Sequence, residues 1–349
     1  MSSSRLIALL RWPQSISHVT DSHWNEIIEQ GRKTQLLGQV AASLQRAQLL
    51  DQVPAPVQRH LALANRTVTR RNESVSWETA ALRRAVDPTI PLVLLKGCAY
   101  VACADDNAAG RIFSDIDVLA RRQDLPAVEA DLASVGWKPS RVNDYDLAYY
   151  RNWMHEVPPM EHVRRHTVVD LHHAINPPVS RFYVNPDQLF ERMVEIRPGI
   201  FVLSATDRVI HCALHLLQEG EPKKLMRDLY DLHLLLRQHH GSAAGMEQLR
   251  NRACELNVDA LTGAAIGAAR ALFAEDLIQG QRSGWLQACV DRAARQTNGN
   301  STVVGELAGM ALLTHSHWMK MPMHLLVPHL IRKSLLRMTS SKDIRLGQT

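Results

Sequence analysis

Several residue patterns that mark particular classes of protein are scarce or absent in this 349-residue sequence. Its five cysteines are scattered, with no Cys-x-x-Cys pair, which argues against a disulfide framework and a zinc knuckle. Aromatic residues make up only 5%, fewer than expected for a protein that stacks nucleic-acid bases. There is no run of about 18 apolar residues that would predict a membrane span, and no signal-peptide pattern. We therefore expect a cytoplasmic protein and do not favour nucleic acid as its partner.

The net charge of +5 is concentrated at the C-terminal end of the chain. Between Lys320 and the last residue there are six Lys or Arg residues and a single acid, Asp343, so the rest of the chain is close to neutral. A basic tail of this kind is most often solvated, and less often it binds an anionic partner such as RNA or a membrane surface.

The distribution of periodic patterns divides the chain into three regions. Residues 1–86 have helix-like apolar spacing, and two prolines in 87–91 then interrupt the pattern. Residues 87–203 mix strand and helix signals, and we expect an α/β core there. Residues 204–349 return to helical spacing, with Ser204 and Asp207 resembling a capping box at the start, and they end in the basic tail.

Within the central region, three short runs of β-forming residues predict strands at 92–96, 113–120 and 166–175. A helix is predicted at 124–137, because Asp124 can cap its start, Pro126 lies in its first turn and Gly136 ends it.

The second predicted strand contains two aspartates, in the run GRIFSDIDVL. Alternation along a strand places Asp115 and Asp117 on one face, while Ile116 and Val118 point to the other. Burying two carboxylates is costly unless a positive charge compensates them. Two converging carboxylates are suited to a hard divalent cation, above all Mg²⁺, although an Asp-x-Asp pair on a solvated strand end is common.

Residues before and after this pair strengthen the interpretation. Lys96 and Gly97 follow the first predicted strand and open a short helix, where a glycine lets a phosphate approach the backbone and a lysine adds positive charge. Asp170 lies on the third predicted strand and could supply a third carboxylate. Such a set could hold two metals and activate a hydroxyl for attack on a nucleotide's α-phosphorus.

Together these motifs resemble the uncharacterised nucleotidyltransferase family of the DNA polymerase β-like superfamily. The resemblance covers about residues 85–240. It implies an α+β fold, in which a mixed β-sheet core with helices is flanked by an N-terminal helical segment and a C-terminal helical bundle. The residues that carry it are Lys96, Gly97, Arg111, Ser114, Asp115, Asp117, Asp170 and His172.

The resemblance implies roles for these residues. Asp115 and Asp117 would hold two Mg²⁺ ions, with Mn²⁺ as a possible substitute, and Asp170 would bind the catalytic metal and help to deprotonate the acceptor. The group with nucleotide-binding roles consists of Lys96, Gly97, Arg111 and Ser114. His172 would contact substrate or support a carboxylate, and a structural role for it is equally open.

The implied reaction transfers a nucleoside monophosphate from a triphosphate to an unidentified acceptor, such as a peptide or a sugar. The chain departs from the superfamily at Lys96-Gly97-Cys98, where a glycine followed by a serine or threonine is usual. Two alternatives therefore stay open: a catalytically degenerate module that binds a nucleotide or partner, and a toxin-like enzyme that modifies protein or RNA. His211 and His215 have zinc-compatible i, i+4 spacing, but without a third ligand a packed or substrate-facing pair is favoured.

Overall fold

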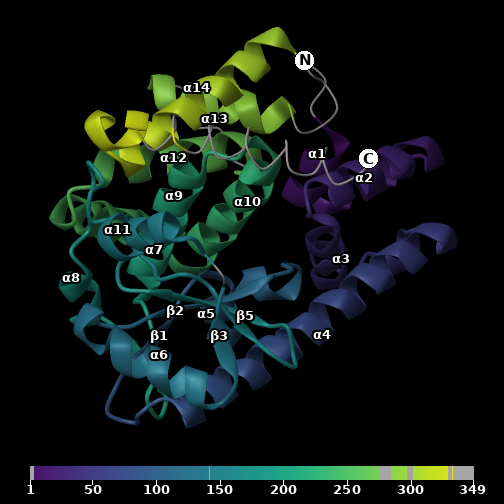
Figure 1. Ribbon diagram of the computed structural model, residues 1–349. Coiled ribbons are helices and arrows are strands. Elements are labelled where there is room, and N and C mark those ends of the chain that lie inside the picture. Colours follow the sequence, from purple (N-terminus) through teal and green to yellow (C-terminus); the bar gives the residue numbers. More distant parts are fainter. Residues whose placement is uncertain (1–3, 141, 275–283, 297–301, 329–331, 333–349) are drawn as a thin grey trace, which may run out of the picture.

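The computed structural model describes residues 4–140, 142–274, 284–296, 302–328 and 332. Its central element is a seven-stranded mixed sheet, with helices above, beside and below it in the view of Figure 1. This arrangement confirms the predicted α+β class, with a mixed-sheet core and flanking helices. Most of the predicted basic tail lies outside the described residues.

All seven strands lie between residues 92 and 202, in the spatial order β3-β4-β5-β2-β1-β7-β6. The β1–β7 and β2–β5 pairs are parallel, and the other neighbouring pairs are antiparallel. The strands are β1 (Leu92–Leu94), β2 (Asp115–Leu119), β3 (Trp137–Pro139), β4 (Met160–His162), β5 (Val168–His172), β6 (Val194–Arg197) and β7 (Ile200–Val202).

The three predicted strands are therefore present but shorter than expected. Their centres are β1, β2 and β5, the strands that carry or adjoin the aspartates. The sequence analysis does not predict β3, β4, β6 or β7, because three or four residues are too few to show an alternation. β1 is equally short, but it is predicted because it lies in the longer run of β-forming residues at 92–96.

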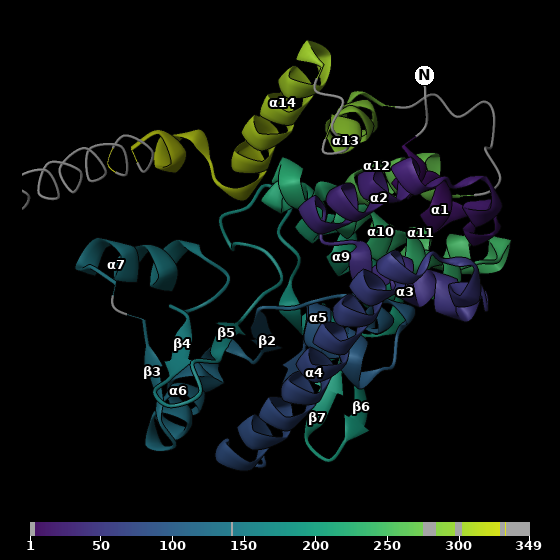
Figure 2. The same cartoon turned by 90° about the vertical axis from the view of Figure 1, so that its right-hand side faces the viewer.

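Helices of the N-terminal region contact both the central region and the C-terminal helices. The 31-residue helix α4 (Ala55–Ala85) packs against α5 (Lys96–Ala102) and α6 (Leu125–Ser134). In Figure 2 it runs diagonally, with β3, β4 and β5 to its left and the β6–β7 hairpin to its right. The three helices before it lie near the C-terminal helices in that view, and α1 contacts α12. These three are α1 (Arg5–Arg11), α2 (Asp21–Lys33) and α3 (Leu37–Arg46).

The C-terminal helices pack on one another above the sheet in Figure 1. As predicted, Ser204 caps the first of them: its side chain accepts a hydrogen bond from the Asp207 amide. That helix ends at Gly220, whose φ of +57° is readily adopted by glycine. The helices are α9 (Ala205–Glu219), α10 (Pro222–His239), α11 (Ala243–Glu255), α12 (Asp259–Phe273), α13 (Trp285–Gln296) and α14 (Val303–Lys320).

Two short helices complete the central region, α7 (Asp144–Trp153) and α8 (Pro186–Phe190). The 3₁₀ turns lie at Pro13–His18 and Leu50–Gln52 in the N-terminal region and at Asp106–Ala109 and Arg122–Asp124 in the central region. Among the described residues, no helix combines the length and the apolar character needed to cross a membrane.

Strand register gives the central sheet two chemically different faces. Val93 pairs with Leu119 on the face that also receives Asp117, whereas Leu94 pairs with Val118 on the other face. Leu94 lines a pocket together with residues of α4 and α5, so those helices cover the apolar face. The aspartates therefore lie on the face opposite to α4 and α5.

Candidate active site

The turn from β1 into α5 brings a lysine to the aspartate-bearing strand. The amide of Leu95 donates to the carbonyl of Asp117 at 3.0 Å, which continues the β1–β2 pairing by one residue. Lys96 follows with a φ of +45°, an unfavourable region for a residue with a Cβ atom. In this conformation its Nζ lies 2.7 Å from Asp117 Oδ1. Strain of this kind often occurs at functional sites, where the surrounding structure holds the backbone in place.

The third predicted carboxylate lies next to the second. Asp117 on β2 and Asp170 on β5 are direct partners in the parallel register, so their side chains share one face on neighbouring strands. Two residues further along β5, His172 places its Nε2 atom 2.9 Å from Asp117 Oδ1. Lys96 and His172, which are 76 positions apart in the sequence, therefore both contact the carboxylate of Asp117.

The charge state of Asp117 follows from these two neighbours. Burial alone raises the pKa of a carboxyl group, but the charge of Lys96 and the hydrogen bond from His172 outweigh it and hold the pKa of Asp117 below its usual range. Burial likewise opposes the charged form of Lys96, yet the attraction of Asp117 leaves the pKa of Lys96 raised. Both groups are therefore charged at neutral pH.

Asp170 has no such compensation. Burial, the neighbouring charge of Asp117 and that of Glu156 together raise the pKa of Asp170 to about 7. Its Oδ1 atom is buried and has no hydrogen-bond partner among the described residues. A buried carboxylate oxygen without a donor is costly, and a bound cation would relieve both the repulsion and the missing contact.

Asp115 completes the predicted set from the same strand. It is half-buried and lies two residues before Asp117, so alternation places both on one face. These carboxylates supply only oxygen donors, the ligands that Mg²⁺ and Mn²⁺ prefer. Together with the unpartnered oxygen of Asp170, they fit a hard divalent cation.

The structure adds two residues that the sequence analysis missed. His155 and Glu156 precede β4, and Glu156 forms an isolated β-bridge with His172. One potential ligand atom from each of these three residues lies within 4.8 Å of the other two. The adjacent His-Glu pair in the sequence is the one signal that could have found them, but nothing in its spacing points to β5.

Arg111 lies away from this cluster. Its guanidinium forms ion pairs with Asp231 at 3.0 Å and with Asp228 at 3.5 Å, both on α10. Asp228 is also paired with Arg227 at 2.8 Å. Arg111 therefore links the segment before β2 to the C-terminal helices, and it is not directed at the carboxylates of the sheet.

Gly97 and Ser114 also have structural contacts. A Cβ atom on Gly97 would lie 2.0 Å from the Phe113 ring, so the absence of a side chain allows α5 to pack on the segment before β2. Ser114 is exposed, and its main-chain carbonyl accepts a hydrogen bond from Arg71. The nucleotide-binding roles of Gly97 and Ser114 therefore stay predictions.

His211 and His215 face one another on α9, with ring centroids 6.3 Å apart. Burial and the nearby charge of Lys96 lower the pKa of His211 to about 3, so the ring is neutral. In the described part of the chain, these two residues are not members of the one His/Cys/Asp/Glu group with metal-compatible spacing. Among the described residues this agrees with the expectation that the pair is not a zinc site, and whether it packs or faces a substrate stays a prediction.

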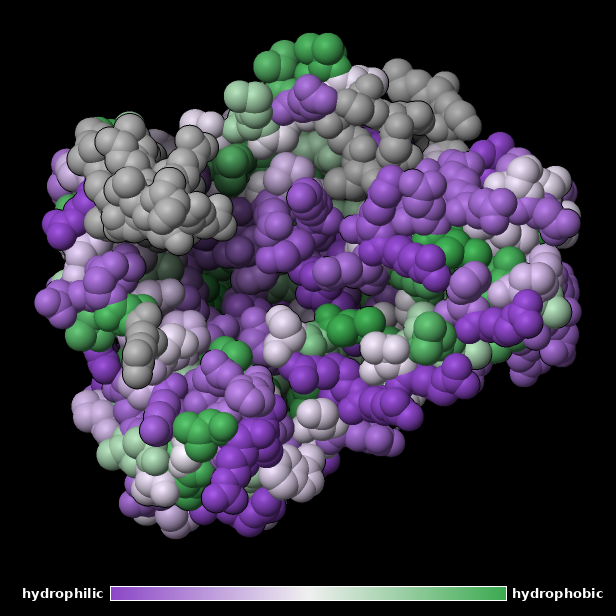
Figure 3. Space-filling view, turned by 45° about the vertical axis from the view of Figure 1, so that its right-hand side comes forward, coloured by the Kyte–Doolittle hydropathy of each residue, from purple (hydrophilic) through white to green (hydrophobic). Residues whose placement is uncertain are grey.

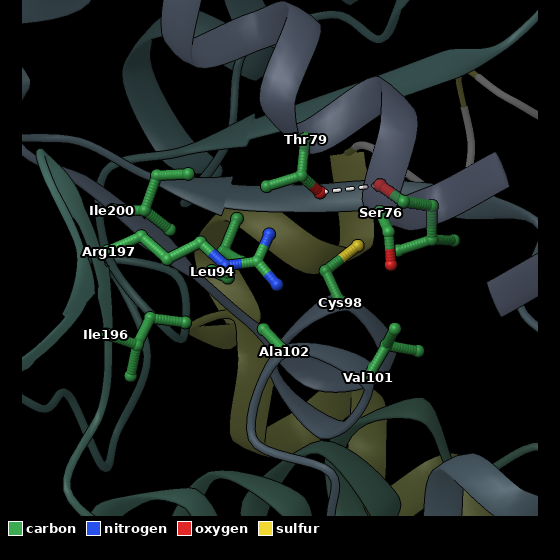
Figure 4. Close-up of a pocket in the computed structure, with 10 residues that line it drawn as sticks. Ser76, Thr79, Leu94, Cys98, Val101, Ala102, Ile196, Arg197 and Ile200 are labelled. Atoms are coloured by element: carbon green, nitrogen blue, oxygen red, sulfur yellow. Dashed lines mark hydrogen bonds between the residues drawn. The ribbon is translucent and has the colours of Figure 1, made fainter. Parts of the chain in front are cut away.

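A separate pocket lies on the other face of the sheet, between α4, α5 and the β6–β7 hairpin (Figure 4). Arg197 extends into it toward Leu94 and Cys98, and none of its lining residues is acidic. It is therefore distinct from the carboxylate cluster. Hydrophilic residues cover most of the molecular face in Figure 3 and surround a hollow near its centre.

Comparison with known proteins identifies the family. A family model described as uncharacterised nucleotidyltransferase matches residues 20–274, which is more than half of the chain and includes the whole carboxylate cluster. No curated protein and no solved structure matches the sequence. The match agrees with the paired strands that carry Asp117 and Asp170, and the chain therefore belongs to the uncharacterised nucleotidyltransferase family.

Proposed function

We propose that this protein transfers a nucleoside monophosphate from a nucleoside triphosphate to an acceptor hydroxyl or similar group, with Mg²⁺ held by Asp115, Asp117 and Asp170. The observation that carries the proposal is the pairing of Asp117 with Asp170 in register, with a buried Asp170 oxygen that lacks a donor. An arrangement of acids that repel one another is unfavourable for stability alone. It becomes favourable when a divalent cation binds between them.

Each residue has a distinct task in this proposal. When bound, the divalent ions neutralise the triphosphate and polarise the reacting α-phosphoryl group. Lys96 and His172 keep Asp117 ionised. Lys96 also offers a point charge to the phosphates, because 26% of its side chain is exposed. Asp170 accepts the proton of the attacking hydroxyl or orients that hydroxyl for in-line attack.

The first test measures ligand-dependent thermal stability of the full chain. Mg²⁺ together with the correct triphosphate is expected to raise the melting temperature, and Asp115→Asn is expected to abolish that rise, because the variant lacks one metal ligand. Asp259→Asn is the matched control, since Asp259 is an exposed aspartate in the first turn of α12. An equal rise in Asp115→Asn and wild type would contradict the assignment.

The second test separates binding from chemistry. Asp170→Asn is expected to bind the triphosphate with a modest penalty but to lose turnover by about 10⁴-fold, equivalent to about 5.5 kcal/mol of transition-state stabilisation. Pyrophosphate release can be followed with water or a surrogate alcohol as the acceptor. If Asp170→Asn releases pyrophosphate at the wild-type rate, Asp170 is not part of the catalytic machinery.

One set of observations favours a second candidate function, a module that binds a nucleotide without transferring it. Where the superfamily usually has a serine or threonine, this chain has Cys98, which is 1% exposed and directs its Sγ atom toward the Asp115 carbonyl. Arg111, expected at the phosphates, is paired with α10. Under this alternative, wild-type protein binds Mg²⁺ and triphosphate but releases no pyrophosphate with any peptide, sugar, protein or RNA acceptor.

A further inference from the structure

We propose that His155, Glu156 and His172 form a second metal site, selective for a nitrogen-preferring ion of the Zn²⁺ class, beside the Mg²⁺ carboxylates. The three residues come from two segments that the fold brings together. The His173 amide donates to the His155 carbonyl at 2.8 Å, and Glu156 pairs with His172. The imidazole rings of His155 and His172 have centroids 5.2 Å apart.

The orientation of the His172 ring supports this site. Its Nε2 atom lies 2.9 Å from Asp117 Oδ1, and its Nδ1 atom lies 3.6 Å from Glu156 Oε2. A positive group between Nδ1 and the Glu156 carboxylate would be in contact with both.

Two ring nitrogens are available for such a group. The Nδ1 atoms of His172 and His155 are both buried and have no hydrogen-bond partner in the described structure, and His172 is 1% exposed. Burial lowers the pKa of His155 well below its usual value and so favours the neutral ring, the form that binds metal. Glu156 is 21% exposed, which leaves a route by which an ion can enter.

The donor set distinguishes this site from the carboxylate site. Two imidazoles and one carboxylate suit Zn²⁺ and similar borderline ions, whereas Mg²⁺ prefers oxygen donors alone. Metal-binding histidines commonly donate their second N–H to a carboxylate, which fixes the tautomer and raises ligand basicity. Asp117 occupies that position relative to His172. Three protein ligands leave a fourth coordination position open to water or a phosphate oxygen.

The two metal sites would be connected by the contact between His172 and Asp117. One ring nitrogen of His172 faces Glu156, and the other contacts Asp117. An ion held by His172 Nδ1 would strengthen the hydrogen bond to Asp117 and so help to fix that carboxylate for Mg²⁺.

The experiment is a calorimetric titration with Zn²⁺ in saturating Mg²⁺, so that the carboxylate site is already filled. Wild-type protein is expected to bind one Zn²⁺, and the double variant His155→Ala/Glu156→Gln to bind it about 100-fold more weakly or not at all. The matched control is His166→Ala/Glu161→Gln, which removes an exposed His–Glu ion pair on the same side of the sheet. Equal Zn²⁺ binding by both double variants would overturn the site.

A second measurement uses the wild-type protein and does not depend on how the variants fold. Nitrogen-15 NMR of the histidine rings is expected to show the Nδ1 signals of His155 and His172 moving when one equivalent of Zn²⁺ is added. If His172 is instead doubly protonated and unmoved by Zn²⁺, an imidazolium bridges Asp117 and Glu156, and the metal site is wrong. Neither result depends on nucleotidyl transfer, so loss of the proposed function would leave this test intact.

Discussion

Two clusters of buried charge, both built partly on the segment around β2, differ in how well they are balanced. In the junction cluster, formed by Arg111, Arg227, Asp228 and Asp231, two guanidinium groups face two carboxylates. In the carboxylate cluster, formed by Asp115, Asp117 and Asp170, one cation, Lys96, forms an ion pair with Asp117. Burial raises the pKa of Asp231 to about 6 and that of Asp170 to about 7.

The difference separates a structural role from a binding role. At the junction, each acid has a fixed arginine partner, so the charges are paired without a ligand and the cluster links the C-terminal helices to the core. At the carboxylate cluster, acids exceed fixed cations and one buried oxygen has no donor among the described residues. The missing positive charge is supplied most simply by a bound cation, and three predictions test this contrast.

The largest effect on stability is expected at the junction. Arg111→Met leaves Asp228 and Asp231 buried without their shared cation, and removing one partner of a buried ion pair typically costs about 3–5 kcal/mol. Urea denaturation measures the loss. Arg295→Met is the control, because its ion pair with Asp291 is exposed and worth at most about 1 kcal/mol. If Arg111→Met is no less stable than Arg295→Met, the junction cluster does not hold the two parts together.

A smaller effect, on ligand binding, is expected at the carboxylate cluster, with opposite signs for Mg²⁺ and for the triphosphate. Lys96→Met removes the cation that competes with metal for Asp117, so Mg²⁺ alone should bind more tightly. Triphosphate binding in saturating Mg²⁺ should weaken by about 1–3 kcal/mol, the value of a charge-assisted hydrogen bond. Both affinities can be measured by calorimetry.

The control for this variant is Lys138→Met, which removes an exposed lysine from β3 and should change neither affinity. Weaker Mg²⁺ binding by Lys96→Met, with unchanged triphosphate binding, would show that Lys96 supports the fold and does not bind the triphosphate.

The third prediction concerns acid stability near the carboxylate cluster. Burial lowers the pKa of His211 to about 3, below the unfolded value of about 6.5. The neutral ring therefore contributes stability that is fully present above pH 6.5 and is lost as the pH falls toward 3. Within this window, wild-type stability should fall by about 1.4 kcal/mol per pH unit more steeply than that of His211→Leu. Denaturation curves at pH 6.5, 5.5 and 4.5 that keep the same difference between the two proteins would refute the assignment.

Local pattern was sufficient for the strands that carry the chemistry. β2 and β5 were predictable because β-branched and apolar residues alternate with aspartates, and alternation placed Asp115 and Asp117 on one face. The start of α9 was predictable because Ser204 satisfies an end amide of its own helix. Those signals depend on neighbours in the sequence and survive in any fold that forms the elements.

Contacts between residues that are distant in the sequence were not predictable in the same way. Arg111 lies four residues before Asp115, yet its charge is directed at α10, because a buried guanidinium pairs with whichever carboxylates the packing brings near. Gly97 has the position of a phosphate-binding glycine, but its immediate neighbour is the Phe113 ring.

The sequence by itself determined the family motif, the α+β class and the aspartates available to a metal, since strand periodicity and residue chemistry are local properties. Only the tertiary structure decided which charges are balanced. It placed Asp170 beside Asp117 through a parallel pairing across more than 50 residues, and it brought His155 and Glu156 to His172. Electrostatic interactions depend on distance in space and on burial, and neither quantity is set by separation along the chain.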